Sequence, residues 1–369
     1  MKKEAHRIRW IVPLGFALAL LAAACGGSTV ASTTTAAPPE EAITTTKAPE
    51  STTTAETTPA APDYAQFLGN PSPDQCAGRE YNLGLDAFSD TESFALATVQ
   101  GMQATAETMG CVTIDVLSDE LDGARALDNV NIFIQQEKDG VILLQVLDAA
   151  QPAIVDALEA SGTPGLASYV PAPGLSFIEV DLALAGFKGG EALGIEALNR
   201  WPGEDIFIII GTFDEGGEVT IATMNGYEEG LLSVVPDFSP DNILRVVTMA
   251  DPPTANANTA AVLARIPDDA KILVGAINDE NTLAMLEAIR TAGRLDNAIG
   301  VGQGATLLDT ICDGTMFATV AYFPELYGSF IVPAIVGLIQ GQELPEYIEL
   351  PTEVLTAENI GEFYSESAC

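Results

Sequence analysis

The chain has few of the side chains that enzymes use to move protons. Its single histidine, His6, lies in a segment that we expect to be removed on export. A mature chain without histidine has no Ser–His or Cys–His nucleophile and no His-ligated metal site. No C-x-x-C or D-x-D-x-D-G spacing occurs, so redox, zinc and calcium-loop interpretations have no support. Carboxylate-only hydrolysis of glycans remains the one enzymatic alternative, although no spacing pairs two carboxylates.

The segment from Gly300 to Ala305 formally fits the G-x-G-x-x-A pattern of a dinucleotide site. It follows a late strand rather than the first strand–helix unit, and a dinucleotide site outside the cell would be unusual. We therefore interpret these glycines as allowing the backbone to approach a ligand or another part of the chain. We expect no cofactor and no metal.

Four cysteines follow Cys25, and they favour two disulfides. An even number of cysteines in an exported chain is typical of a disulfide framework. Three pairings are possible, and we favour Cys76–Cys111 and Cys312–Cys369. The first pair precedes two strands that should be neighbours in one sheet, and the second would hold the C-terminal tail. Free buried thiols are the alternative.

The charge balance is strongly acidic. The 369 residues carry 15 Lys and Arg against 52 Asp and Glu, a net charge of -37. Such a surface repels phosphate backbones, which excludes nucleic acid as a partner. Apolar residues make up 47% of the chain. This is enough to bury a large core, and the length suits two lobes with additional segments.

The N-terminus has the pattern of an export signal. Residues 1–9 are basic, and the apolar run from Trp10 to Ala24 is too short for a membrane span but fits a signal peptide over 1–24. Leu21-Ala22-Ala23-Ala24-Cys25 resembles a bacterial lipobox, with Ala22 where Leu or Val is usual. We expect a lipid on Cys25 that holds the exported protein at the outer face of the bacterial cytoplasmic membrane. Ordinary secretion with cleavage nearby is the alternative.

Residues 25–73 form a linker between this signal and the folded part. The segment is rich in Thr, Ala, Pro and Glu and shows no apolar periodicity. Because it cannot bury enough apolar surface to order itself, we expect a flexible tether. Coil statistics give it an r.m.s. reach on the order of 35–40 Å. The sequence thus predicts a folded part held near a membrane.

From Arg79 onward, short apolar runs alternate with amphipathic stretches of helical length. We expect strands at 81–87, 111–117, 140–146, 164–168, 205–211, 243–249, 271–276, 298–302 and 316–321. Strict alternation predicts an α/β fold with doubly wound parallel sheets. About ten strands exceed one comfortable sheet, so two similar lobes are the simpler solution. The apolar run 330–339 is too short to cross a membrane and should be a core helix.

In such sheets, ligands bind beyond the carboxyl ends of the strands, where loops and helix N-termini meet. This rule selects eight loops: 88–94, 145–148, 168–170, 212–217, 250–256, 278–281, 303–306 and 322–325. Polar and aromatic residues of these loops are the candidates for ligand contact.

Four segments occur in an order and spacing typical of one family. They are 139–150 (DGVILL, then DAA), 162–165 (GTPG), 278–294 (ND, then AGR) and 341–345 (GQELP). Together they resemble the sugar-binding type I periplasmic binding proteins, the ribose- and galactose-binding group of ABC transporters. The resemblance covers residues 79–360, and it rests on order and spacing rather than on any single segment.

The resemblance implies two lobes that are joined by three hinge strands and that close on a ligand. It places the hinge crossings near 179–181, 322–324 and 346–350. It gives an N-terminal lobe of 74–179 plus 324–345, and a C-terminal lobe of 180–323 plus 346–369. It also implies a partner, an ABC permease with its ATPase.

The resemblance identifies two candidate ligand contacts directly. Phe94 keeps an aromatic ring on which a sugar could stack, with a core position at a helix start as the alternative. Asn278 matches a binding amide, which can both donate to and accept from hydroxyls. The adjacent Asp279 is a further candidate, with capping of the following helix as its alternative.

Other family positions are changed. Ser168-Tyr169 and Thr223 stand where arginines are usual, Gln303-Gly304 where an aspartate is, and Tyr322 where a glutamine is. A ribose-type pocket uses arginine and aspartate to hold hydroxyls through charge-assisted hydrogen bonds. These replacements leave the matching positions neutral.

Carboxylates lie in the same set of loops. Glu92 comes before Phe94, and Asp214 and Glu215 follow Phe213. If they face the ligand, they favour a hydroxyl-rich neutral molecule or a cation, and solvated surface carboxylates are the alternative. An anionic ligand is disfavoured, because no Arg or Lys is placed to meet it.

Three hypotheses of function follow. The first is an extracytoplasmic solute-binding lipoprotein that captures a sugar or sugar-like molecule for an ABC importer and is not an enzyme. The second keeps the fold but makes the protein a ligand-sensing subunit for chemotaxis or for a membrane kinase. The third, more remote, is the carboxylate-only glycan hydrolase.

Overall fold

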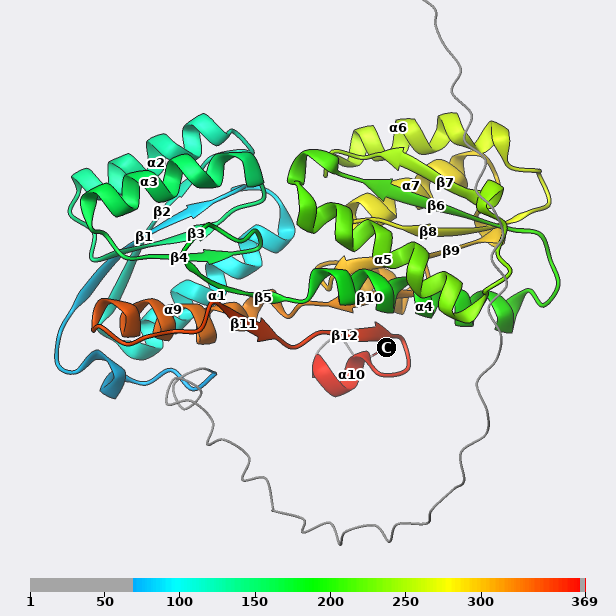
Figure 1. Ribbon diagram of the computed structural model, residues 1–369. Helices are drawn as coiled ribbons and strands as arrows, with labels where there is room; N and C mark the ends of the chain where they lie inside the picture. Colours follow the sequence, from blue (N-terminus) through cyan, green and yellow to red (C-terminus); the bar gives the residue numbers. More distant parts are fainter. Residues whose placement is uncertain (1–68, 366–368) are drawn as a thin grey trace, which may run out of the picture. The chain divides into compact units, whose positions relative to one another are not determined.

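The computed structural model describes residues 69–365 and Cys369. The expected signal peptide, Cys25 and nearly all of the expected linker lie outside the described residues. In the described part, strands and helices alternate and form two six-stranded sheets (Figure 1). We call the part built on the first sheet the first lobe and the part built on the second sheet the second lobe. The α/β class with two parallel-sheet lobes that the sequence predicts is thereby confirmed.

The first sheet has the strand order β11-β5-β4-β3-β1-β2, and its pairings are parallel. Its strands are β1 (Tyr81–Ala87), β2 (Val112–Ser118), β3 (Gly140–Leu144), β4 (Gly165–Ser168), β5 (Ser176–Val180) and β11 (Tyr347–Leu350). Its main helices are α1 (Ser93–Met109), α2 (Gly123–Gln135), α3 (Gln151–Ser161) and α9 (Tyr327–Ile339). Helices α1 and α9 cover one face of the sheet, and α2 and α3 cover the other (Figure 1).

The apolar runs of the first lobe are buried on both faces of the sheet. Alternate side chains of a strand point to opposite sides. Ile142 of β3 therefore joins the core under α1 and α9, whereas its neighbours Val141 and Leu143 join the core under α2 and α3. A strand that is covered on both sides must be apolar throughout, which is the pattern that its sequence shows.

The second sheet has the order β12-β10-β9-β8-β6-β7. Its strands are β6 (Ile206–Thr212), β7 (Ile243–Val247), β8 (Lys271–Gly275), β9 (Ala298–Gly304), β10 (Ala318–Ala321) and β12 (Glu353–Thr356). Its helices are α4 (Leu182–Arg200), α5 (Glu218–Val234), α6 (Pro252–Val262), α7 (Asp279–Thr291) and the short α8 (Asp309–Cys312) and α10 (Ile360–Phe363). Ile208 and Ile210 pack with α4 and α5, and Ile209 packs with α6 and α7.

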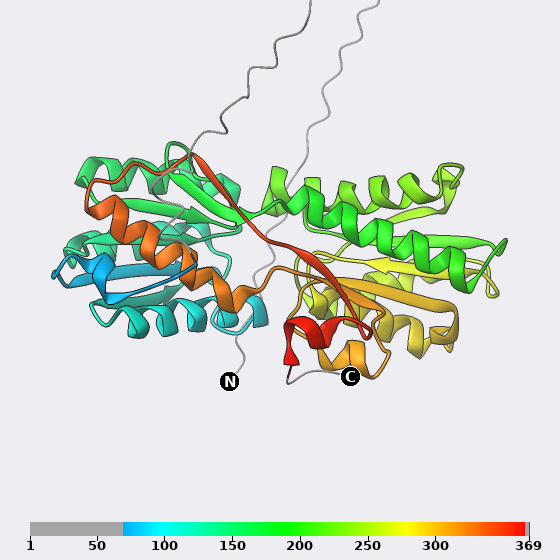
Figure 2. The ribbon, with the colours of Figure 1, turned by 90° about the horizontal axis from the view of Figure 1, so that it is seen from below.

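Three connections join the lobes, and they lie together along one side of the molecule (Figure 2). They lead from β5 to α4, from β10 to α9, and from β11 to β12. Strand β11 runs parallel to β5, but β12 runs antiparallel to β10. A chain that leaves one sheet at its carboxyl end and then runs against the next sheet must enter that sheet at its carboxyl end. The carboxyl ends of the two sheets therefore face each other.

The third crossing differs from the sequence-based expectation. The resemblance places it near 346–350 and assigns these residues to the C-terminal lobe. In the structure, Tyr347–Leu350 is strand β11 of the first sheet, in register with Phe177–Val180, and the chain crosses after Leu350. The expectation was wrong here because a short edge strand of four residues carries little periodic signal.

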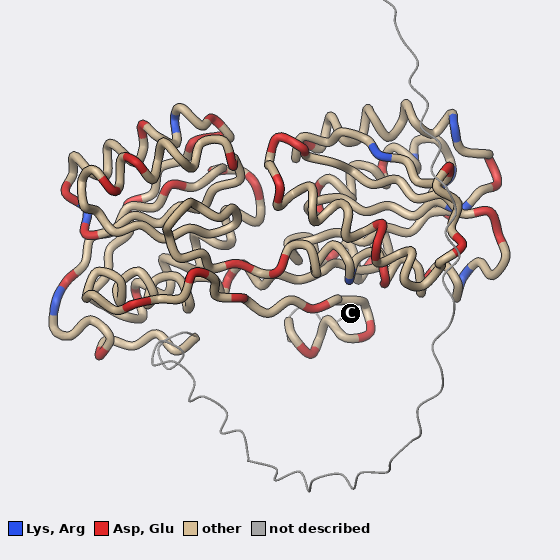
Figure 3. The backbone as a smooth tube through the Cα atoms, viewed as in Figure 1, with Lys and Arg blue, Asp and Glu red and all other residues tan. Residues whose placement is uncertain are grey.

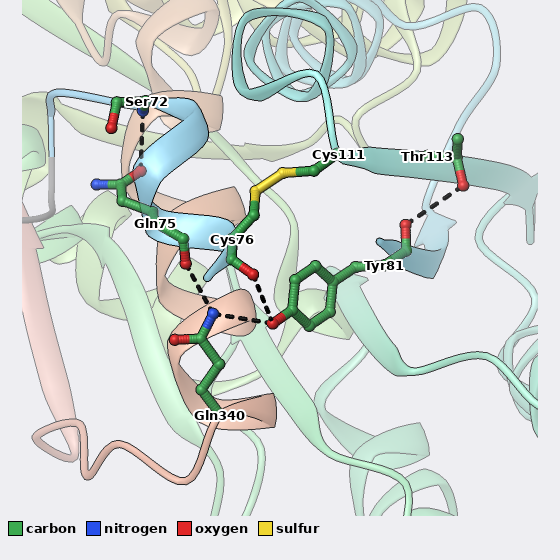
Figure 4. Close-up of a disulfide and its surroundings, with 7 residues drawn as sticks. All are labelled: Ser72, Gln75, Cys76, Tyr81, Cys111, Thr113 and Gln340. Atoms are coloured by element: carbon green, nitrogen blue, oxygen red, sulfur yellow. Dashed lines mark hydrogen bonds between the residues drawn. A yellow bond between two sulfur atoms is a disulfide. The ribbon is translucent and has the colours of Figure 1, made fainter. Parts of the chain in front are cut away.

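The structure contains the two disulfides that the sequence favours. Cys76–Cys111 joins the 3-10 helix η2 (Pro73–Cys76) to the residue before β2, and Cys312–Cys369 joins α8 to the C-terminal residue. Figure 4 shows how the first disulfide is supported. The hydroxyl of Tyr81 donates to the carbonyl of Cys76 (3.4 Å) and accepts from Nε2 of Gln340 (2.9 Å). The disulfide thus lies in a polar network that reaches the end of α9.

The helix α9 contains the apolar run 330–339 and is a core helix, as expected from its length. Ile331, Val332 and Ile335 are fully buried against the first sheet. Among the described residues, the search for a helix with the length and apolarity of a membrane span finds none.

Helices α4 and α5 pack backbone to backbone. A Cβ added at Gly186 would overlap the carbonyl group of Thr223, and one added at Gly190 would overlap that of Tyr227. From the other side, a Cβ at Gly230 would overlap the carbonyl oxygen of Phe187. These glycines are required by the close approach of the two helices.

We expect Gly186→Ala to lower the free energy of unfolding by about 2 kcal/mol. Overpacking costs about 1–3 kcal/mol or more and outweighs the roughly 1 kcal/mol that Ala contributes to helix propensity. Urea denaturation of the purified protein measures the change. Leu198→Ala, at an exposed position of the same helix, is the control and should change stability by less than about 0.5 kcal/mol. Equal stability of wild type and Gly186→Ala would contradict the close packing.

Candidate functional site

A cavity of about 310 Å³ lies where the carboxyl ends of the two sheets face each other. Its walls come from residues that end or follow β1 to β4 in the first lobe and β6 to β10 in the second. The volume lies at the lower end of the range for small-molecule sites. The lining residues are Phe88, Ser89, Thr91, Glu92, Phe94, Glu120, Leu121, Val146, Tyr169, Phe213, Met249, Ala250, Asp251, Pro252, Ile277, Asn278, Glu280, Gln303, Gly304 and Tyr322.

The structure brings most of the candidate residues from the sequence together in this cavity. The seven that line it are Glu92, Phe94, Tyr169, Phe213, Asn278, Gln303 and Tyr322. They come from six different loops that are far apart in the sequence. The carboxyl-end rule therefore selects these residues although no local pattern connects them.

Three other candidates lie elsewhere. Thr223 is buried on α5, where its hydroxyl donates to the carbonyl of Val219 (3.0 Å) and its own backbone meets α4. Ser168 is fully buried and donates to a carboxylate oxygen of Glu179 (3.3 Å). Asp214, in the 3-10 helix η4 (Asp214–Gly216), is exposed and does not line the cavity. The arginine positions of the resemblance thus belong to packing and to the hinge in this chain.

Asn278, and not the adjacent Asp279, caps the helix that follows. Asn278 lines the cavity and is also the N-cap of α7, because its Oδ1 accepts from the N–H of Asn281 (2.9 Å). Asp279 is fully buried and accepts from Oγ1 of Thr319 (2.7 Å) and from the N–H of Thr306 (2.8 Å). Burial raises the pKa of Asp279 to about 6. Asp279 therefore holds the loop after β9 and does not reach the cavity.

Aromatic rings form a continuous wall of the cavity. The ring of Phe94, in the first turn of α1, lies 5.7 Å from that of Tyr169 and 5.9 Å edge-to-face from that of Tyr322. Phe88 extends the wall, with 5.8 Å between its ring and that of Tyr169. Such spacings are those of favourable aromatic pairs. A flat apolar face of a ligand can therefore lie against this wall.

Glu179 holds the aromatic wall from behind. It is fully buried at the end of β5 and accepts from the hydroxyl of Tyr327, the N–H of Tyr169 (2.7 Å) and the N–H of Val180 (2.9 Å). Burial raises the pKa of Glu179 to about 7, although these hydrogen bonds oppose the shift. Tyr169 has a positive φ of 71°, which a bulky residue adopts only when its surroundings fix it. The bond from its N–H to Glu179 provides that support.

Gln303 and Tyr322 provide the polar part of the wall. Both residues are buried and both line the cavity. The hydroxyl of Tyr322 donates to Oε1 of Gln303, which fixes the orientation of the amide. The Nε2 of Gln303 has no hydrogen-bond partner among the described residues. This nitrogen is itself buried, and the Gln303 amide interacts with the hydroxyl of Tyr227, where it opposes the rise in pKa that burial causes, so the structure does not expose the N–H group to the cavity.

The two lobes meet through polar contacts between the N-termini of α1 and α7. The N–H and the hydroxyl of Ser93 both donate to the carboxylate of Glu280. Across the same boundary, Nδ2 of Asn278 donates to Oε1 of Glu92 (3.3 Å). Glu92 also caps α1 by accepting from the N–H of Ala95 (2.8 Å). Burial, with repulsion from Glu280 as a smaller cause, raises the pKa of Glu92 to about 7.

Several lining residues were not among the sequence candidates. Asp251 and Glu280 lie at helix starts within loops that the carboxyl-end rule selects, so their places could have been found from the sequence. Glu120 and Leu121 follow β2 in a loop that was not selected. Both have positive φ values, 53° and 59°. Glu and Leu are not residue types that indicate such a backbone conformation.

A buried pair of acids lies behind the loop that carries Glu120. Nε2 of Gln145 donates to both Asp86 and Asp119, and Nδ2 of Asn129 donates to Asp86 (2.7 Å). Both carboxylates are fully buried. Burial, with repulsion from Asp119 as a smaller cause, raises the pKa of Asp86 to about 8, so at neutral pH the folded protein favours its protonated form.

We expect Asp86→Asn to reduce the pH dependence of stability. A folded-state pKa that is raised to about 8 stabilises the protein fully below the unfolded value near 4, and this contribution is lost as the pH rises toward 8. The midpoint of thermal unfolding of the wild type should fall by several degrees between about pH 5 and 8. The variant should show a shallower slope, though not a flat one, because Glu92 and Glu179 have shifts of the same sign.

The control for this experiment is Asp128→Asn, at an exposed position of α2 next to Asn129. Its slope should equal that of the wild type. The same slope in Asp86→Asn and in the wild type would show that Asp86 is not the buried titrating group.

Comparison with known proteins gives one family and many related folds. A model of the family described as "Periplasmic binding protein domain" matches residues 87–343. The ribose import binding protein of Bacillus subtilis (strain 168) is 24% identical over 283 residues, which cover 75% of this chain and 88% of that protein. The matched region contains all the residues that line the cavity.

Solved structures share the fold. The Caulobacter myo-inositol binding protein, solved with myo-inositol, matches with a TM-score of 0.67 and 20% identity over 77% of this chain and 96% of that one. The fructose-binding periplasmic domain of a hybrid two-component system matches with a TM-score of 0.63 and 18% identity over 78% of this chain and 98% of that one. At these identities, the likeness establishes the architecture of two lobes around a central site.

Proposed function

The chain belongs to the periplasmic binding protein family, and on that premise we propose that it captures a sugar or sugar-like molecule between its lobes. It is a binding protein and not an enzyme. We further propose that it delivers this ligand to an ABC permease and its ATPase. The function then rests on affinity, since a ligand that contacts both lobes shifts the population toward the closed form.

The observation that carries the proposal is the composition of the cavity. An aromatic wall lies beside the amide side chains of Asn278 and Gln303, and hydroxyl-rich rings need an apolar surface together with such amides. The apolar face of a sugar would lie on Phe94 and Tyr169, and its hydroxyl groups would meet Gln303 and Asn278. The ligands named for related proteins, ribose and myo-inositol, are hydroxylated molecules of this kind.

Closure is supported by the contacts between the starts of α1 and α7. The bonds from Ser93 to Glu280 and from Asn278 to Glu92 cross the cleft beside the cavity. Such charge-assisted bonds favour the approach of the two lobes. The ligand supplies the remaining contacts, which is the basis of hinge closure in two-lobed receptors.

A sensor is the second candidate function. The fold match to the periplasmic domain of a hybrid two-component system supports it. The capture step is the same in both cases, and only the partner differs. Uptake of the identified ligand by cells with and without this protein separates them, because a sensor subunit changes gene expression or movement but not uptake.

We expect a polyol to raise the midpoint of thermal unfolding, and we expect Gln303→Met and Phe94→Ala to remove this shift. A ligand at 100 times its dissociation constant adds about 2.7 kcal/mol to stability, which moves the midpoint by degrees. The panel consists of pentoses, hexoses, inositols and nucleosides. Gln303→Met keeps the side-chain length and removes the N–H donor. Affinity should fall at least about tenfold in each variant.

The control for the ligand screen is Gln100→Met on the exposed face of α1, which should bind like the wild type. If the ligand shifts the wild type and both pocket variants equally, it binds outside the cavity. If no member of the panel shifts the wild type, the proposed capture of a sugar-like molecule is wrong.

We also propose that the protein is exported and attached to the outer face of the cytoplasmic membrane by a lipid on Cys25. The expected lipobox, which lies outside the described residues, supports this proposal. Cys25→Ser should move the protein from the membrane fraction to the soluble fraction or the medium, because the lipid supplies the attachment. Metabolic labelling with a radioactive fatty acid should be lost in parallel. Retention of Cys25→Ser in the membrane fraction would contradict the anchor, and Cys111→Ser is not a suitable control because it breaks a disulfide.

A further inference from the structure

The charges around the cavity narrow the class of ligand. We propose that the ligand carries a positively charged nitrogen as well as hydroxyl groups, as an amino sugar or an aminocyclitol does. This inference rests on the proposed function, because it concerns the same cavity. It concerns a property, the charge of the ligand, that a general sugar-binding function leaves open.

The lining has acids but no bases. Glu92, Asp251 and Glu280 all line the cavity, and no Lys or Arg is among the lining residues. Glu120 is a fourth lining carboxylate, but the hydrogen bond from Ser118 and, as a smaller cause, the charge of Arg125 lower its pKa and partly compensate its charge. Acidic residues occur all over both lobes, as Figure 3 shows, so their presence alone is not distinctive. The distinctive feature is that no Lys or Arg lines the cavity to compensate these carboxylates.

Helix termini compensate these carboxylates only in part. Glu92 and Asp251 are the N-caps of α1 and α6, and Glu280 lies in the first turn of α7. Each helix N-terminus carries a partial charge of about +0.5, so three termini supply about +1.5. Three carboxylates supply -3 when all are ionised. Because Glu92 has a raised pKa of about 7, the sum lies near -1 at neutral pH. One positive charge on a ligand balances it.

The aromatic wall favours the same ligand. The faces of Phe94, Tyr169 and Tyr322 carry the negative part of the ring quadrupole, which attracts an ammonium group. Beside these buried rings, each carboxylate acts over a medium of lower dielectric than bulk water. Carboxylates together with aromatic rings are the usual surroundings of a bound amine.

Gln303 favours a second property of the ligand, a hydroxyl group in addition to the positive charge. Its amide lines the cavity beside Tyr322, and a ligand that draws the N–H group toward the cavity must supply an oxygen atom, which an ammonium group cannot provide. A simple polyamine has no such oxygen atom. A ligand with a hydroxyl group at one end and an amine at the other satisfies both Gln303 and the carboxylates.

Isothermal titration calorimetry on matched pairs tests the inference. The probes are D-glucosamine with D-glucose, D-galactosamine with D-galactose, and scyllo-inosamine with scyllo-inositol. In at least one pair, the amine should bind about tenfold or more tightly than its hydroxyl counterpart at low salt. The difference should shrink between about 20 mM and about 150 mM salt, because screening weakens the attraction of charges.

Two variants locate the effect. Glu280→Gln keeps an oxygen that can accept from Ser93 but removes the charge, so it should weaken binding of the amine about tenfold more than binding of its neutral counterpart. Glu287→Gln, on the same helix but on its exposed side with Arg290, is the control and should bind both like the wild type. If neutral sugars bind as tightly as the amines or more tightly, the inference is wrong and the proposed function stands. If neither member of any pair binds, both are wrong.

Discussion

The opposition of the two sheets is the constraint on which the site depends. Three connections leave their sheets at the carboxyl ends, and the antiparallel entry of β12 beside β10 requires that these ends face each other. Because helices follow most of the parallel strands, the N-termini of α1, α6 and α7 then converge on one cavity. The residues that cap these helices also line the cavity. Glu92, Asp251 and Asn278 thus have two functions, and a substitution of any of them changes a helix end as well as the cavity.

Burial of carboxylates is the main energetic cost of this arrangement. Glu179 is fully buried at the hinge, and this burial raises its pKa. Four different groups donate hydrogen bonds to its carboxylate and oppose the shift. A buried charge is tolerated only when it is hydrogen-bonded in this way. In return, Glu179 fixes Tyr169 and Tyr327, and these two rings hold Phe94 from two sides. The hinge strand β5 and the aromatic wall are therefore one mechanical unit.

The sequence predicts the architecture well because its signals are local. Apolar runs of five to eight residues mark the strands, and their carboxyl ends select the loops that contain Phe94, Asn278, Gln303 and Tyr322. What the sequence cannot show is where a side chain points. Thr223 lies on the face of α5 that packs against α4, and Asp279 turns inward whereas its neighbour Asn278 turns to the cavity. Glu120 lines the cavity because its loop has two residues with positive φ, and the residue types of this loop do not predict that conformation. The crossing after β11 depends on pairing with a strand some 170 residues earlier.

The replaced arginines explain what the cavity rejects. The resemblance places arginines at Tyr169 and Thr223, where they would hold hydroxyl groups and would also tolerate a carboxylate or phosphate on the ligand. Here one position is a ring in the wall and the other is inside the packing of two helices. An anionic sugar would meet Glu92, Asp251 and Glu280 with no cation to compensate them. Specificity is a difference of affinities, and repulsion contributes to it as much as attraction does. Under the proposed function, the cavity therefore separates ligands first by charge, and the shape of the aromatic wall distinguishes among those that remain.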